Sequence, residues 1–180
     1  MLQTRILVTY ASQAGSTAEV AEAIGQVLTQ RGAQVDVRPM KTVTDLAPYQ
    51  AVVAGSAIHG SKWLPEALQF VKTHRDELSQ KPFAAFMVCI SLGMASADKY
   101  RDGIAGWMEP VRRLVSPVSE GRFAGCLDFK KLPVTFNTLM MRVAVAFKAL
   151  PEGDHRDWKA IQAWTESIYP LLGKRTGFRS

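Results

Sequence analysis

Residues 5–17 read RILVTYASQAGST, and this stretch decides the fold class. Its first part, residues 5–10, is mostly apolar and predicts a buried strand. Small and polar residues follow at 11–15 and predict a turn. Apolar side chains then recur at helical spacing along residues 16–30, which predicts a helix with Gly32 as its C-cap. The chain therefore opens with a strand, a tight turn and a helix.

The same alternation continues along the rest of the chain. Further strands are predicted at residues 35–40, 51–57, 83–91 and 123–129, and further helices at 65–79, 98–115 and 157–172. The strand at 83–91 is apolar on both faces, which is typical of a sheet covered by helices on each side. Alternating strands and helices predict right-handed βαβ units. We expect an α/β fold, with a doubly wound parallel sheet of five strands in one domain spanning residues 1–180.

One segment exceeds this minimal pattern. Residues 130–157 separate the fifth strand from the last helix, where a short connection would suffice. Within this inserted segment, residues 133–150 predict an apolar helix with only a narrow polar stripe. Such a helix needs cover from the protein, from a partner subunit or from a lipid interface. A short basic tail follows at residues 173–180.

Composition and charge narrow the class of protein. The apolar fraction of 47% and the charged fraction of 21% are typical of a globular chain. Neither a signal peptide nor an uncharged apolar stretch of about 18 residues is present, so we expect a cytoplasmic protein without a membrane-spanning helix. Cys89 and Cys126 form no CxxC pair and are expected to be reduced core residues.

The positive charge is concentrated in the last part of the chain. Residues 1–111 carry ten basic and ten acidic side chains, whereas residues 112–180 carry twelve and six, so the whole net charge of +6 lies there. Such a field favours an anionic partner, and a solvated basic face is the alternative. The basic residues Lys130, Lys131, Arg142 and Lys148 frame the apolar helix. They suit binding to an anionic membrane surface or to a flat carboxylated substrate. The alternative is that the helix covers the edge of the sheet or forms the interface of a homo-oligomer, and then binds neither a membrane nor a substrate.

The turn between the first strand and the first helix is a candidate phosphate site. The first turn of a helix carries unpaired N–H groups and the positive end of the helix dipole, and a phosphate can bind there. Neither a lysine nor an arginine lies in this loop, and neither the P-loop nor the G-x-G-x-x-G pattern is present. The alternative is an ordinary turn with Ser16 or Thr17 as the N-cap. The candidate phosphate-binding residues are Ser12, Gln13, Ala14, Gly15, Ser16 and Thr17.

Two further loops are expected at the same edge of the sheet, where open parallel sheets bind their ligands. The candidate residues that would hold a flat ring are Ser56, Ala57, Ile58, His59 and Gly60 in one loop, and Ser91, Leu92, Gly93 and Met94 in the other. His59 is the candidate catalytic residue, as a proton donor or as a hydrogen-bond partner of the ring. The alternative is a histidine that faces solvent. The histidines and carboxylates match no metal-ligand spacing, so we expect no metal site.

The loop at residues 12–17 resembles the FMN-phosphate loop of flavodoxins, [ST]-x-[ST]-G-x-T. Ser12, Gly15 and Thr17 match this pattern, and Ala14 departs from it. The resemblance implies a flavodoxin-like fold and FMN as the cofactor. Three features are similar to menaquinone-dependent protoporphyrinogen oxidases: the ending of the third strand at residues 56–59, the inserted helix, and the run at 151–158. This second resemblance implies oxidation of a porphyrinogen with a quinone as acceptor, in heme biosynthesis.

The ring loops differ from those of electron-shuttle flavodoxins, which usually stack aromatic rings on the flavin. Ile58, His59, Leu92 and Met94 stand there instead. Fewer aromatic and acidic neighbours predict a less negative flavin potential, which favours a two-electron oxidoreductase. The alternative is an FMN electron carrier without a substrate of its own. A receiver-type domain is disfavoured, because no carboxylate ends the first or the third strand, and a scaffold without FMN remains as a further alternative.

The remaining expectations concern partners and individual side chains. We expect a small-molecule redox substrate or a quinone, no nucleic acid, and peripheral contact with the inner face of the membrane through residues 130–150. His74 is expected at the surface, and His155 in a capping and salt-bridge cluster before the last helix. Trp107, Trp158 and Trp164 are expected in the core.

Overall fold

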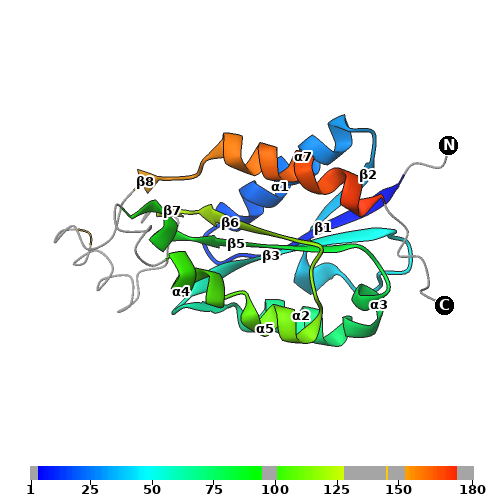
Figure 1. Ribbon diagram of the computed structural model, residues 1–180, viewed down its shortest axis with the longest axis horizontal. Helices are drawn as coiled ribbons and strands as arrows, with labels where there is room; N and C mark the ends of the chain where they lie inside the picture. Colours follow the sequence, from blue (N-terminus) through cyan, green and yellow to red (C-terminus); the bar gives the residue numbers. More distant parts are fainter. Residues whose placement is uncertain (1–3, 95–100, 128–144, 146–152, 174–180) are drawn as a thin grey trace.

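The structure is a computed structural model that describes residues 4–94, 101–127, 145 and 153–173 (Figure 1). Its centre is a parallel sheet with the strand order β2-β1-β3-β5-β6. A short strand, β4 (Lys62–Trp63), pairs antiparallel with the end of β3. The predicted five-stranded parallel sheet is therefore confirmed, with one antiparallel addition. The parallel strands are β1 (Arg5–Ala11), β2 (Gln34–Pro39), β3 (Ala51–His59), β5 (Phe83–Cys89) and β6 (Ser119–Ala124).

Helices cover both faces of the sheet, as Figure 1 shows. On one face, α1 (Ser16–Gln30) and α7 (Trp158–Leu172) pack side by side. The other face is covered by α2 (Pro65–Thr73), α3 (Arg75–Ser79), α4 (Arg101–Gly106) and α5 (Glu109–Leu114). Two short 3-10 helices, η1 (Met40–Thr42) and η2 (Ile90–Gly93), follow β2 and β5. The carboxyl ends of the parallel strands thus face one common edge of the molecule.

The sheet separates two hydrophobic clusters. Side chains alternate along each strand, so Val53 joins the cluster under α1 and α7, while Val52 and Ala54 join the cluster under α2 to α5. All residues of β5 are buried, in agreement with the prediction of a strand that is covered on both faces. Each fully buried Ile, Leu or Phe contributes about 1.5–3 kcal/mol relative to its exposed state.

The fifth parallel strand begins earlier than the sequence predicts. The prediction placed it at residues 123–129, whereas β6 is Ser119–Ala124. The first half of β6 has no apolar pattern, because Gly121 fills the inward position there. A Cβ on Gly121 would lie 2.8 Å from the Phe123 ring and 3.0 Å from the Trp164 ring, so only glycine fits. Beyond β6, the strand β7 (Cys126–Leu127) leaves the sheet and pairs antiparallel with β8 (Gly153–Asp154).

Two predicted helices are divided. The helix predicted at residues 65–79 is interrupted at His74, whose φ and ψ are −99° and 18°. The helix predicted at 98–115 is described from Arg101 and is interrupted before Pro110, a residue that lacks the N–H needed for a continuous helix. The predicted helix at 133–150 lies outside the described residues apart from residue 145, and so do its framing basic residues. The tail at 173–180 also lies outside them apart from Gly173.

Two side chains differ from their predicted exposure. His74 was expected at the surface, yet it is 9% exposed because it packs on the Phe70 ring at the division between α2 and α3. Trp158 was expected in the core, yet it is 43% exposed. The guanidinium of Arg156 lies 4.6 Å from the centre of the Trp158 ring, so this tryptophan covers a charged group instead of filling the core. In the described part of the chain, no helix combines the length and the apolar character that a bilayer crossing requires.

Candidate functional site

The turn between β1 and α1 has the backbone geometry of an anion site. Gly15 is the N-cap residue of α1, and its φ of 89° lies in the left-handed region that favours glycine. No side chain caps this end of the helix. The alternative of an ordinary turn predicted Ser16 or Thr17 as the N-cap, and this N-cap assignment is wrong. A Cβ on Gly15 would meet nothing within 4 Å, so the space beside the turn is open.

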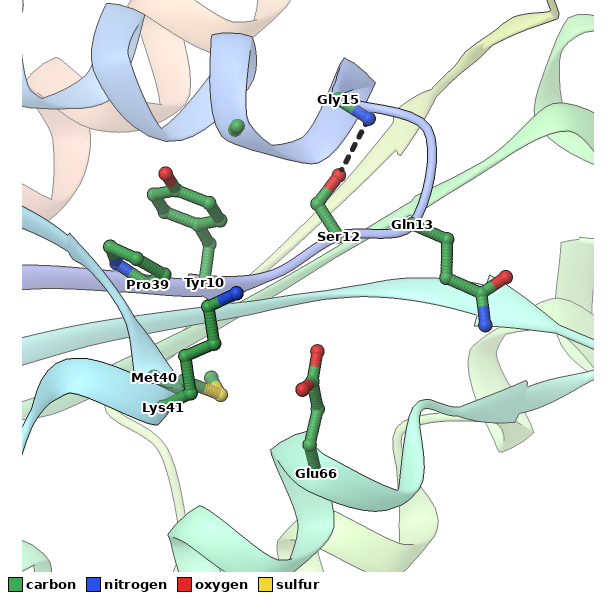
Figure 2. Close-up of a pocket in the computed structure, with 9 residues that line it drawn as sticks. Tyr10, Ser12, Gln13, Gly15, Pro39, Met40, Lys41 and Glu66 are labelled. Carbon is green, nitrogen blue, oxygen red and sulfur yellow. Dashed lines mark hydrogen bonds between the residues drawn. The ribbon is translucent and has the colours of Figure 1, made fainter. Parts of the chain in front are cut away.

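Hydrogen-bond donors converge on this open space. The first bond of the helical ladder runs from the Glu19 N–H to the Gly15 carbonyl, so the N–H groups of residues 16–18 precede the ladder. The Gly15 N–H donates to Ser12 Oγ over 3.0 Å (Figure 2). Because Ser12 Oγ accepts this bond, its own O–H remains to donate to a ligand. The turn offers donors without offering a positive side chain.

Thr17 supplies a polar atom that has no partner. Its side chain is buried at 0% exposure, and Oγ1 makes no hydrogen bond with the described residues. Leaving a buried hydroxyl unpaired costs about 1–3 kcal/mol. Thr17 lies in the first turn of α1, so we expect an acceptor that binds the N–H groups of this turn to pair with the hydroxyl as well. A phosphate has this chemistry, so the residues of the turn fit the phosphate end of FMN.

A pocket of about 400 Å³ lies beside the turn. Figure 2 shows that it extends from the turn toward the end of β2 and the start of α2. Its walls combine residues from β1, the turn, α1, β2, η1 and α2, and two of them are charged. The lining residues are Tyr10, Ser12, Gln13, Gly15, Ala18, Pro39, Met40, Lys41 and Glu66. The sequence prediction named only Ser12, Gln13 and Gly15 among these.

The second predicted loop is a β-hairpin. The strand β3 continues to His59, two residues beyond its predicted end, and a two-residue turn connects it to β4. Gly60 and Ser61 have φ values of 56° and 62°, as in the type I′ turns that fit the twist of a hairpin. The Ser56 hydroxyl is buried and accepts the Leu64 N–H over 3.0 Å, so it holds the start of α2 instead of facing a ligand. His59 is exposed near the tip of the hairpin.

The third predicted loop is η2, which carries Ser91, Leu92 and Gly93 and has Met94 as its C-cap. All four residues are half-buried, and Leu92 packs against the core. Gly93 is in close contact with another segment, because a Cβ there would lie 2.7 Å from Cβ of His155. The predicted ring segments therefore lie at the end of β3 and after β5, two neighbouring strands, at the same edge of the sheet as the turn.

Residues 153–157 connect this loop to the start of α1. The backbone N–H of His155 donates to the Gly125 carbonyl. The side chain of Arg156 is 7% exposed and forms ion pairs with Asp154 over 2.6 Å and with Glu19, in the first turn of α1, over 2.5 Å. The hydrogen bond from Arg156 lowers the pKa of Asp154 to about 2. Asp157 caps α7 by accepting the Ala160 N–H. The predicted capping and salt-bridge cluster is confirmed, and it also reaches the helix that carries the candidate phosphate site.

Other reactive groups at this edge have structural explanations. Cys89, at the end of β5, is 4% exposed, and burial raises the pKa of its thiol, so it is an unreactive core residue as predicted. Cys126 is half-buried and forms no disulfide. Across the described ranges, His, Cys, Asp and Glu side chains nowhere form a group of three that could hold a metal ion.

The structure brings the predicted turn and the two predicted ring segments to one edge of the sheet. Sequence reasoning missed Tyr10, Lys41 and Glu66 as neighbours of the turn. The signal for Lys41 lies in the strand pairing, because Tyr10 of β1 is opposite Pro39 of β2 in the register. Residues that follow these two positions therefore lie near each other beyond the sheet edge. The contact of Glu66 depends on the packing of α2, which no local pattern predicts.

Comparisons with known proteins agree with this geometry. A family model described as flavodoxin domain matches residues 7–152, which is most of the chain. The structure is similar to a flavodoxin from Archaea, with 17% identity, a TM-score of 0.57, and coverage of 95% of this chain and 100% of that one. It is also similar to a short-chain flavodoxin associated with a non-canonical PDU bacterial microcompartment, with 13% identity, a TM-score of 0.60, and coverage of 95% and 100%.

A third similar structure belongs to a larger protein. The rubredoxin oxygen:oxidoreductase of Desulfovibrio gigas is 17% identical with a TM-score of 0.51, and the match covers 94% of this chain and 37% of that one. At these identities, the likeness establishes the fold alone. A comparison with curated proteins gave no match.

Proposed function

Because this chain belongs to the flavodoxin domain family, whose cofactor is FMN, we propose that it is an FMN-dependent oxidoreductase. In this proposal, residues 12–17 bind the phosphate of FMN, and the flavin ring lies between the β3–β4 hairpin and η2. The cofactor supplies electron or hydride transfer when bound. The chain's own residues bind the phosphate, orient the ring and set the electrostatic surroundings.

The observation that supports the phosphate assignment best is the unpartnered Thr17 hydroxyl behind the left-handed Gly15. A turn whose polar groups all had hydrogen-bond partners would not need a ligand. This turn instead buries a hydroxyl donor that has no acceptor among the described residues. Ser12 supports the assignment because its hydroxyl is oriented by the Gly15 N–H and can still donate outward. Neutral donors of this kind act with the helix dipole to hold an anion.

Gly15→Val tests this assignment, and Gly32→Val is its matched control. The two glycines lie at opposite ends of α1, have φ values of 89° and 93°, and would each place a Cβ in open space. The backbone strain of the two variants is therefore nearly the same. Gly15→Val is expected to purify colourless and to fail to take up added FMN, because a branched side chain occupies the space of the phosphate. Gly32→Val is expected to keep its flavin spectrum.

The result that contradicts the assignment is a folded Gly15→Val variant with full FMN occupancy. Far-ultraviolet circular dichroism of both variants establishes folding, and the absorbance of bound flavin near 450 nm gives the occupancy. Loss of flavin in both variants equally would attribute the effect to strain in α1, and this outcome also contradicts the assignment.

The residues near the proposed ring site favour a substrate-using enzyme over an electron shuttle. Ile58, His59, Leu92 and Met94 supply neither a tryptophan nor a tyrosine ring, and the neighbouring Trp63 is 2% exposed and therefore cannot stack on a ligand. His59 is exposed near the hairpin tip, where it could donate a proton to a reduced ring or to a substrate. We propose His59 as the candidate catalytic residue, and His59→Gln is expected to lower turnover by more than it lowers FMN affinity.

An FMN electron carrier without its own substrate is the second candidate, because the family and its structural relatives include flavodoxins. A spectroelectrochemical titration of the FMN-loaded protein separates the two candidates. A two-electron enzyme is expected to be reduced in one step. Two well-separated one-electron steps, with a very negative second potential, would favour the carrier.

For the substrate, we propose a porphyrinogen-type molecule with a quinone as electron acceptor. The basic surplus after residue 111 supports a flat, carboxylated or membrane-associated partner. The same surplus supports peripheral contact of a cytoplasmic protein with the inner face of the membrane, and an apolar helix at 133–150 would also suit a homo-oligomer. Anaerobic stopped-flow mixing with protoporphyrinogen is the test. Bleaching of the flavin and its recovery on addition of a menaquinone analogue are expected, and an unchanged flavin spectrum would exclude this substrate.

A further inference from the structure

The pocket beside the turn at residues 12–17 is lined by two charged side chains that the turn itself does not predict. Lys41 and Glu66 line it together with Ser12 and Gly15. Neither Lys41 nor Glu66 forms an ion pair with any residue in the described part of the chain. Figure 2 shows that the Lys41 side chain extends from η1 toward the turn and that the Glu66 carboxylate points into the same space from α2. Lys41 is the one cation among the described residues that line this pocket.

The pairing of β1 with β2 places Lys41 beside the turn. Tyr10 and Pro39 are opposite each other on β1 and β2, and each strand leaves the sheet just after this pair, with Ser12 in the turn after β1 and Lys41 in η1 after β2. Adjacent strands are about 4.8 Å apart, and the flexible stem of a lysine spans more than this distance. An ammonium at Lys41 can therefore reach an anion that is bound by the turn.

The backbone that carries Lys41 is well anchored. Met40 is 4% exposed and belongs to the hydrophobic core, and the Thr42 hydroxyl donates to the Pro39 carbonyl over 2.9 Å. The Val43 N–H closes the 3-10 turn on the Met40 carbonyl. These contacts hold the backbone at Lys41, whose side chain is exposed.

The charge balance of the turn explains why a cation is needed. A phosphate monoester carries up to two negative charges, and the turn contributes only neutral donors. Two carboxylates lie near the start of α1, and only one of them has a cationic partner among the described residues. Glu19 is paired with Arg156, whereas Glu66 faces the pocket. Without Lys41, the phosphate would face an uncompensated carboxylate.

We propose that Lys41 is the counter-charge of the FMN phosphate and makes this chain select the phosphorylated flavin over riboflavin. The proposal rests on the proposed function, since it takes residues 12–17 as the phosphate site. Glu66 has the opposite effect and weakens phosphate binding by repulsion. Lys41 is thus a binding residue that acts on the phosphate and not on the flavin ring.

Titration of the flavin-free protein with FMN and with riboflavin, followed by quenching of flavin fluorescence, tests the proposal. Lys41→Gln is expected to weaken FMN binding about five- to tenfold, which corresponds to the loss of one charge-assisted hydrogen bond. Its affinity for riboflavin, which has no phosphate, is expected to change less than twofold. Lys41→Arg is expected to keep FMN affinity, and Glu66→Gln to increase it about twofold.

Lys72→Gln is the matched control, because it removes the same charge from an exposed position in α2 outside the pocket. FMN affinity of the wild type is also expected to fall more steeply with salt than that of Lys41→Gln. Equal FMN affinity of Lys41→Gln and wild type overturns the inference about Lys41 while the phosphate site stands. A wild type that binds neither FMN nor riboflavin overturns the proposed function itself. Equal weakening by Lys72→Gln would attribute the effect to net charge and overturn the inference as well.

Discussion

The hydroxyl of Thr17 is expected to lower the stability of the flavin-free protein and to strengthen FMN binding. This hydroxyl lies in the first turn of α1 without a hydrogen-bond partner among the described residues, and it destabilises the protein before any ligand arrives. Natural sequences retain such a local conflict chiefly at functional sites. Thr165 offers the contrast, because its equally buried hydroxyl donates to the Ile161 carbonyl over 2.7 Å.

Thr17→Val is therefore expected to stabilise the flavin-free protein and to weaken FMN binding. The free energy of unfolding should rise by about 1 kcal/mol, since valine removes an unpaired polar atom at similar volume. FMN affinity should fall about tenfold, because a hydrogen bond to a charged group is lost. Urea unfolding and FMN titration measure the two effects. In the control Thr165→Val, FMN affinity should stay unchanged and stability should not rise. A Thr17→Val protein that loses stability and keeps its affinity would show that the hydroxyl is structural.

Gly55 shows why a glycine near the site is not always a ligand position. It lies in β3 close to the candidate ring segment, but a Cβ there would lie 2.0 Å from the Phe86 ring. Gly55→Ala is expected to destabilise the protein by about 3 kcal/mol through overpacking, in the presence and absence of FMN alike. Gly103→Ala in α4 is the control, because its Cβ would meet nothing within 4 Å, and it should not destabilise. Chemical denaturation measures both, and a stable Gly55→Ala variant would contradict this packing argument.

At the scale of helices and strands, the sequence predicted the elements whose bounds follow from a local residue pattern. The helix at Ser16–Gln30 was predicted with its observed bounds because its apolar face is regular, although its C-cap is Arg31 and the predicted C-cap Gly32 follows it with a φ of 93°. Interruptions caused by tertiary contacts were not predictable. His74 divides a helix where its ring packs on Phe70, and β6 begins at residues whose inward position is a glycine covered by two aromatic rings. The turn at residues 12–17 was found from its motif, whereas the neighbouring Lys41 required the strand order.

The segment of residues 153–157 is expected to respond to acid through Asp154. The pKa of this carboxyl is about 2 in the folded protein, against 3.8 in the unfolded chain. A lowered folded pKa contributes stability that is present above pH 3.8 and is lost as the pH falls toward 2. Since the Asp154 side chain is 44% exposed, solvent screening limits this contribution to less than about 1 kcal/mol.

Asp154→Asn isolates this contribution, because it keeps the shape of the side chain and removes its charge. The variant should be less stable than the wild type at pH 5, and the difference should shrink toward zero as the pH approaches 2. Urea unfolding at a series of pH values between 5 and 2 measures it. A difference that stays constant over this range would mean that the Asp154–Arg156 pair does not titrate as described.

At the scale of the whole molecule, the candidate site draws together segments that are distant along the chain. The phosphate turn follows β1, the hairpin follows β3 and η2 follows β5, and the parallel sheet places the ends of these strands at one edge. Arg156 adds a further link by pairing with Glu19 across 137 positions of sequence. Ligand binding at this edge therefore involves elements from both helical layers and all three central strands. It should stabilise the fold as a unit and not only the loops that touch the ligand.

FMN is accordingly expected to raise the melting temperature by linkage. At a free FMN concentration about 100 times its dissociation constant, the stabilisation is about 2.7 kcal/mol. For a chain of this length, this corresponds to an increase of about 5–10 °C. Because the phosphate carries much of the binding energy in this proposal, riboflavin at the same concentration should raise the melting temperature much less. Differential scanning calorimetry of the flavin-free protein with each ligand measures both increases. Equal increases with FMN and riboflavin would locate the binding energy in the ring site and contradict the central role of the turn at residues 12–17. A melting temperature that rises with the logarithm of FMN concentration, but not with that of riboflavin, would support this role.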